Sequence, residues 1–171
     1  MSISSYVATP QQASKALTLL ICVAVILLAV ITPANAAVGI AGNSPWWTRF
    51  SYPFFHASLI HASLNAWGLY AIVFRYDLTP RHLVAAFAIA AAIPAGLLGQ
   101  TPVLGISAIF FALAGFTSFK IRQRLKWHLY MAAFIAAGFA LPSVAAMIHL
   151  YAYLTAVIVS LIMRLFHYGR I

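Results

Sequence analysis

Four polar residues in otherwise apolar stretches have the side chains that nucleophilic chemistry needs. Ser107 supplies a hydroxyl, and His149 supplies an imidazole that can accept its proton, which is how a serine becomes a useful nucleophile. His61 and Asn65 are four residues apart and would share one face of a helix. With the Ser107 backbone N–H, they would be candidate donors to an oxyanion. No acid lies nearby, so the pair would be a Ser–His dyad without a carboxylate.

The composition places these residues in a membrane protein. Of 171 residues, 64% are hydrophobic and 6% are charged, whereas a soluble domain has about a quarter charged residues. Asp77 is the only acid and Cys22 the only cysteine, which excludes paired-carboxylate catalysis, carboxylate-rich metal sites and a disulfide framework. The expected molecule is an all-α, multi-pass integral membrane protein that uses no cofactor and no metal.

The apolar runs predict a single transmembrane domain over residues 1–171 with six helices. We expect these helices at about residues 16–33, 54–74, 82–98, 105–120, 127–141 and 143–165. The last two are separated at Pro142, because one helix from Trp127 to Met163 would be about 55 Å long against a hydrocarbon core of roughly 30 Å. The first run precedes ANAA (34–37) and also resembles a signal peptide; we expect a retained helix.

The basic residues predict the orientation. With six spans, one side of the membrane receives Lys15, Arg75, Arg81, Lys120, Arg122, Arg124, Lys126, Arg164 and Arg170. That side should be cytoplasmic, and only Arg49 lies on the outer side. We therefore expect a bacterial inner-membrane protein with both termini in the cytoplasm. No basic stripe with interleaved aromatic residues occurs, so nucleic acid is not an expected partner.

Counting along these helices puts three of the polar side chains at one depth. His61, Ser107 and His149 would each lie about 10 Å below the outer surface. The helix at 105–120 would be only about 22 Å long, too short to span, so loop 99–104 must dip into the membrane. Irregular backbone at that depth is tolerated where it is buried in protein or lines a watery cavity, and such a cavity would supply water for hydrolysis.

In this order and spacing, the residues resemble those of the rhomboid intramembrane serine proteases. Four segments carry the resemblance, which covers about residues 46–160: WWTRFSYPFFH (46–56) in the first outer loop, HASLIHASLN (56–65) with the His-x4-His-x3-Asn motif, GISAIFFALAGF (105–116) with the Gly-x-Ser motif, and MIHLYAYLTAV (147–157) with the family's base.

The resemblance implies a six-helix rhomboid-like bundle with a short, membrane-embedded fourth helix. It implies a serine endopeptidase that acts on single-span or membrane-anchored proteins, with the site opening to the outer side. Ser107 and His149 would be catalytic, with the oxyanion donors named above. Gly105 would let the loop approach closely, Phe111 would pack on the catalytic histidine, and His56 would have a structural role.

Two positions depart from the family pattern. Ala108 follows the serine and Ala152 lies one turn after His149, each where a glycine is usual. The added methyl groups fall at a helix contact where small residues let backbones approach. The distance between the Ser107 hydroxyl and the His149 imidazole therefore shows whether these methyl groups keep the two side chains apart.

Three other functions remain open at this stage. A close variant is rhombosortase-like processing of C-terminal membrane anchors. A catalytically inactive rhomboid-like protein would bind membrane clients, although the presence of both Ser107 and His149 argues against it. A small transporter with a histidine proton relay would lose function on substitution of His61 and be indifferent to Ser107.

Overall fold

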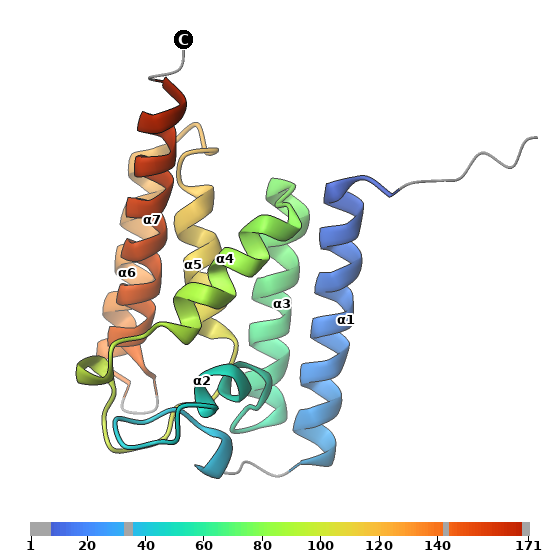
Figure 1. Cartoon of the computed structure of the whole chain (residues 1–171), viewed down its shortest axis with the longest axis vertical. Coiled ribbons are helices and arrows are strands. Elements are labelled where there is room, and N and C mark those ends of the chain that lie inside the picture. Colours follow the sequence, from blue (N-terminus) through green and yellow to red (C-terminus); the bar gives the residue numbers. More distant parts are fainter. Residues whose placement is uncertain (1–7, 33–35, 142–143, 169–171) are drawn as a thin grey trace, which may run out of the picture.

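The computed structural model describes residues 8–32, 36–141 and 144–168, and over these residues the chain is helical (Figure 1). The α-helices are α1 (Pro10–Ile31), α2 (Thr48–Ser51), α3 (Leu59–Tyr76), α4 (Pro80–Ala91), α5 (Ser107–Thr117), α6 (Arg124–Phe139) and α7 (Ala146–Tyr168). Short 3-10 turns cover Ala36–Val38, Tyr52–Phe54 and Ala95–Leu97. Within the described ranges, the extended pairing is limited to one antiparallel bridge between Ile40 and Val103.

Two helices have the length and composition to cross a membrane. They are α1, with a mean hydropathy of 2.6, and α7, with a mean hydropathy of 2.0. A third candidate is the pair Thr48–Phe54 and Leu59–Tyr76, which is bent by 94° and counts only if both parts form one span. The prediction of an all-α membrane protein is confirmed at this level.

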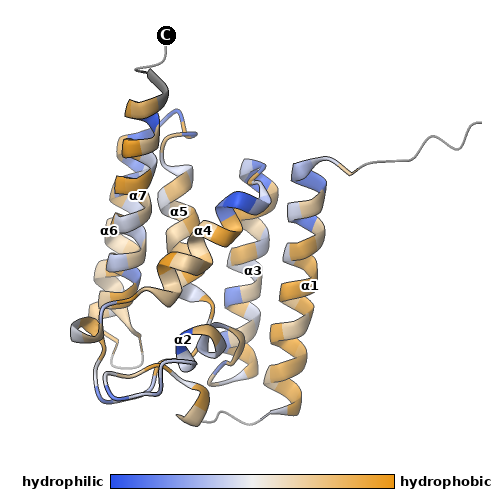
Figure 2. Ribbon diagram, viewed as in Figure 1, coloured by the Kyte–Doolittle hydropathy of each residue, from blue (hydrophilic) through white to orange (hydrophobic). Residues whose placement is uncertain are grey.

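The helices run alternately between two ends of the molecule. Figure 1 shows the start of α1, the α3–α4 and α5–α6 loops and the end of α7 at one end, while α4 crosses the bundle obliquely. We call this the basic end; among the described residues its cations are Lys15, Arg75, Arg81, Lys120, Arg122, Arg124, Lys126 and Arg164. Hydrophilic colours gather there and at α2 (Figure 2). The opposite end, where α5 and α7 begin, is called the site end.

Helix α5 forms the centre of the fold. Apart from Ser107 and Phe110, all its residues are buried, and it packs against α7, α4 and α3. Gly115 makes the closest approach to α7, since a Cβ there would lie 2.5 Å from the Tyr153 carbonyl oxygen and 2.7 Å from the Ala156 Cβ. Backbone-to-backbone contact of this kind is available only to a glycine.

The helix predicted at 54–74 begins later, at Leu59. Pro53 lies in a 3-10 turn, and Phe55 after it has an extended backbone. Ser58 then caps α3, with its side chain accepting a hydrogen bond from the His61 N–H at 3.1 Å. His61 therefore lies in the first turn of its helix and not two turns into it.

The other predicted boundaries also move by a few residues. The helix predicted at 16–33 begins at Pro10, because Thr9 and Gln12 form a capping box ahead of it. The helix predicted at 82–98 runs from Pro80 to Ala91, and Pro94 and a 3-10 turn follow. The remaining three run 107–117, 124–139 and 146–168. The predicted break at Pro142 lies outside the described residues.

Candidate active site

Helices α5 and α7 bring Ser107 and His149 together at the site end. Ser107 is the first residue of α5, and His149 lies in the first turn of α7. The Ser107 Oγ and the His149 Nε2 are 2.8 Å apart, a hydrogen-bond distance. Ala108 and Ala152 are both buried in this contact region, and their methyl groups do not separate the pair. The imidazole is 8% exposed, and the serine is half-buried.

An aromatic ring fixes the plane of the His149 imidazole. Phe111, one turn after Ser107 on α5, stacks on it with ring centroids 4.4 Å apart and planes at 21°. Phe134 of α6 packs against Phe111 at 5.5 Å. The imidazole is therefore held by a hydrogen-bond partner at Nε2 and by a ring against its face, as the sequence led us to expect for Phe111.

Gly105 brings the backbone before Ser107 against two polar side chains of α3. Its φ of +119° lies in the region that favours glycine, and its N–H donates to the Tyr52 carbonyl at 2.9 Å. A Cβ at this position would lie 3.1 Å from both the Asn65 Nδ2 and the His61 Cε1. The two predicted oxyanion donors therefore face the segment that leads into Ser107.

The Asn65 side-chain amide is a hydrogen-bond donor without an acceptor in the described part of the structure. Its Nδ2 is buried. Buried donors without a partner are uncommon and call for an explanation. A transient acceptor beside Gly105 would satisfy this one.

His56 contacts the segment that leads into Ser107. Its Nε2 accepts a hydrogen bond at 3.3 Å from the N–H of Ile106, the residue before Ser107. Its ring is 3% exposed and meets the His61 ring edge to face at 5.1 Å. These contacts give His56 a role in holding the loop.

The first turns of three helices converge on this site. His61, Ser107 and His149 lie in the first turns of α3, α5 and α7. The His61 and His149 N–H groups are already paired, with the Ser58 side chain and the Ala145 carbonyl. Helix N-termini nevertheless have a partial positive potential, which favours negative charge beside the Ser107 hydroxyl.

Loop 99–104 pairs part of its backbone with the segment after α1. Ile40 and Val103 exchange two backbone hydrogen bonds, at 3.0 and 2.9 Å. The Gly42 N–H donates to the Gly99 carbonyl at 3.0 Å. Protein pairing of this kind is what irregular backbone requires inside a membrane.

A second set of contacts, which was not predicted from the sequence, holds the end of α4. Two hydroxyls donate to its terminal carbonyls: Tyr52 to Ala90 and Tyr151 to Ala92, each at 3.1 Å. Arg49 donates to Ala91, also at 3.1 Å. Arg49 could have been found from the sequence, because it is the only cation on the predicted outer side and a lone arginine in an apolar loop needs hydrogen-bond acceptors. No sequence pattern pointed to the two tyrosines.

A cavity of about 290 Å³ lies between the segment from Leu97 to Val103 and the facing ends of α6 and α7. Ile148, the neighbour of His149, lines it, whereas neither Ser107 nor His149 does. The cavity therefore adjoins the start of α7 without including the two site residues.

The assembled groups suit acyl transfer. A serine hydroxyl, an imidazole and several donors lie together, and within the described part of the chain no group of three His, Cys, Asp or Glu residues could hold a metal. Comparisons with protein-family models, curated proteins and solved structures give no match to this chain. The chemical interpretation therefore rests on the geometry of these side chains.

Proposed function

We propose that the chain is a multi-pass intramembrane serine endopeptidase of the rhomboid type. It cleaves a peptide bond in, or next to, the transmembrane segment of a single-span or membrane-anchored protein. The observation that carries the proposal is the 2.8 Å distance from the Ser107 Oγ to the His149 Nε2 in a helical membrane protein.

The mechanism follows from these two groups. Neutral His149 takes the hydroxyl proton as the Ser107 Oγ bonds to the substrate carbonyl carbon. The oxyanion accepts hydrogen bonds from the Ser107 N–H, the Asn65 Nδ2 and His61. His149 then gives its proton to the departing amine as the C–N bond breaks. Water, deprotonated by His149, attacks the acyl-enzyme and restores Ser107 with release of the carboxylate product.

The proposed membrane placement puts the basic end in the cytoplasm and the site end toward the outer side. The six spans are α1 and α3 to α7, with both termini cytoplasmic in a bacterial inner membrane. Helix α5 has 11 residues, which make about 16 Å, too short for a hydrocarbon core of roughly 30 Å. Its first residue, Ser107, therefore lies below the outer surface.

Substrates enter laterally past α6 in this proposal. Helix α6 buries Met131, Ile135 and Gly138, which lie on one face, and leaves large apolar side chains such as Leu129 exposed. Phe134 of this helix packs against Phe111, and Phe111 in turn stacks on His149, the proposed catalytic histidine. A substrate helix must unwind locally before attack, so we expect small or helix-breaking residues at the cut.

Cleavage of a tagged single-span reporter tests the proposal. Wild-type protein and Ser107→Ala are reconstituted separately with the reporter, and the fragments are sequenced at their new ends. We expect a fragment from wild type and none from Ser107→Ala. Equal fragment from both proteins, or an uncut reporter that co-purifies with both, would contradict the proposal. A cut confined to C-terminal membrane anchors would identify the rhombosortase-like variant.

A further inference from the structure

The loop between α5 and α6, together with the first turn of α6, gathers positive charge at the basic end. Lys120, Arg122, Arg124 and Lys126 alternate with other residues, and all four are exposed. The exposed Arg164 of α7 adds a fifth cation, and its Nη1 donates to the Phe119 carbonyl at 3.4 Å. We call these five residues the basic loop cluster.

The carboxylate side chains of the chain cannot neutralise this cluster. The sequence contains one acid, Asp77. Its carboxylate lies 2.8 Å from the Lys15 Nζ and also interacts with Lys120. The cluster has five cations, so most of its counter-ions must come from outside the protein.

Two arginines from different helices meet at one residue of the cluster. The guanidinium groups of Arg124 and Arg164 lie over the Phe119 ring, 5.7 and 5.2 Å from its centroid. Such contacts hold cations in a fixed place. An anion beside Phe119 would be attracted by both charges, and guanidinium groups match phosphate oxygens in a bidentate fashion.

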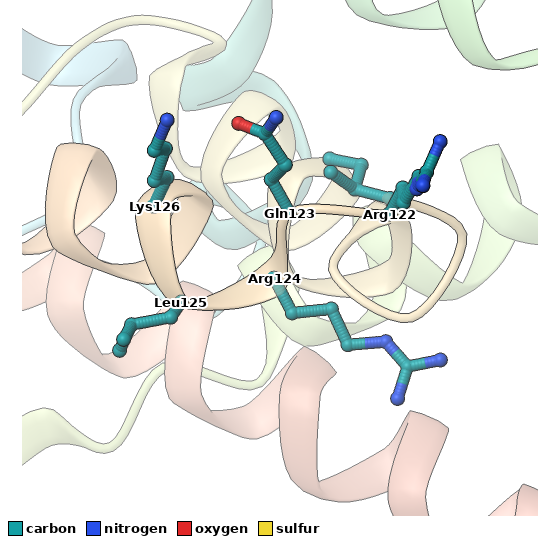
Figure 3. A pocket seen from close by; sticks show the side chains of 6 residues that line it. Arg122, Gln123, Arg124, Leu125 and Lys126 are labelled. Carbon is teal, nitrogen blue, oxygen red and sulfur yellow. The ribbon is translucent and has the colours of Figure 1, made fainter.

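The surface beside these cations is hollowed and partly apolar. Residues Ile121 to Lys126 line an open hollow of about 680 Å³. In Figure 3, the side chains of Arg122, Gln123 and Lys126 extend to one side of the chain, and those of Arg124 and Leu125 to the other. Leu125 is 72% exposed and Leu129 on the next turn is 59% exposed. Cations next to exposed aliphatic side chains fit the boundary between headgroups and acyl chains.

We propose that the basic loop cluster binds the phosphate headgroup of an anionic phospholipid. The ligand is a lipid and not a soluble anion because the cluster lies at the ends of apolar helices in a membrane protein, where an anionic leaflet presents phosphate at high local concentration. The inference does not depend on the proposed proteolysis.

Native mass spectrometry from nanodiscs tests the proposal. Protein is reconstituted in phosphatidylcholine mixed with phosphatidylglycerol, and the lipids retained after release are counted. The test variant is Arg124→Gln with Arg164→Gln. The matched control, Arg75→Gln with Arg81→Gln, removes the same charge from two exposed residues of the same end. Affinity should fall about fivefold per removed charge in the test variant.

The expected result is retained phosphatidylglycerol with wild type and control, and its loss with the test variant. Equal retention by test variant and wild type, or equal loss in control and test variant, would overturn a specific site. Displacement by millimolar inorganic phosphate would overturn the lipid assignment. Should the test variant not fold, Arg124→Gln alone takes its place, because it removes one of the two guanidinium groups over Phe119 and keeps the Arg164 hydrogen bond to the Phe119 carbonyl.

Discussion

The Phe111 ring stacks on the His149 imidazole, with centroids 4.4 Å apart and an interplanar angle of 21°. This contact joins the helix that begins with Ser107 to the helix that carries His149. The orientation of His149 therefore depends on an apolar neighbour as well as on its hydrogen-bond partner. In the proposed dyad, which lacks a carboxylate, that apolar contact would take over part of the orienting role of a third polar group.

Phe111→Leu should slow cleavage while leaving the protein folded. An aromatic pair contributes ~1 kcal/mol beyond its buried area, so loss of the contact should reduce the rate by about fivefold. Phe116→Leu is the matched control, because Phe116 is buried on the same helix but meets His82 and not His149. Initial rates of reporter cleavage compare the two variants. Equal slowing of both would assign the effect to packing alone.

Asn65→Ala should reduce cleavage strongly without lowering stability. Removal of an oxyanion donor typically costs about 10² to 10³ in turnover. Because the Asn65 Nδ2 has no hydrogen-bond partner among the described residues, its removal breaks no bond of the resting protein. Turnover and the thermal unfolding temperature, measured on the same preparation, report activity and stability separately. A drop in the unfolding temperature with turnover unchanged would mean that Asn65 is structural.

Gly115→Ala should destabilise the contact between α5 and α7. The new Cβ would lie 2.5 Å from the Tyr153 carbonyl oxygen, so one backbone must shift. Overpacking of this kind typically costs about 1–3 kcal/mol, and it should also displace Ser107 from His149. Gly96→Ala is the control, since a Cβ at Gly96 meets nothing within 4 Å. Unfolding in detergent measures both variants, and equal stability of the two would contradict the packing described for Gly115.

The ion pair of Asp77 predicts a small pH dependence of stability. Lys15 lowers the pKa of the Asp77 carboxyl below its ordinary value. The pair therefore stabilises the fold above the unfolded pKa of about 3.9, and the contribution is lost as the pH falls through the lower folded value.

Asp77→Asn isolates this contribution. Asparagine tolerates the left-handed φ of +46° found at this position. We therefore expect a slightly lower unfolding temperature than wild type at neutral pH, and equal temperatures once the pH lies below the lowered pKa of the folded Asp77 carboxyl. A difference of the same size at both pH values would assign the effect to helix termination.

The residues of the candidate site could be chosen from the sequence because a membrane makes polar side chains conspicuous. Ser107 and His149 stand out from apolar runs, and the structure brings them within hydrogen-bond distance. The prediction that α5 is short also agrees with its observed bounds. Composition and the lengths of the apolar runs were sufficient to single out these residues and the short helix, because both depend on local sequence. The pairing of Ser107 with His149 was expected from their depths along the helices and from the family resemblance.

Contacts between distant segments could not be predicted in the same way. The start of α3 depends on Ser58 as a cap, which a run of apolar residues conceals. The hydrogen bond from Tyr151 to the Ala92 carbonyl and the pairing of Ile40 with Val103 join residues about sixty positions apart. No local pattern specifies such pairs, because they follow from how the helices pack.

Covalent labelling of Ser107 is the most direct test of the central claim. Purified protein in detergent is treated with a serine-directed fluorophosphonate, and the modified peptide is identified by mass spectrometry. A nucleophile activated by His149 predicts an adduct on Ser107 in wild type and little or none in a folded His149→Ala variant. An adduct of equal yield in both proteins, or a folded wild type that remains unlabelled at Ser107, would contradict the account.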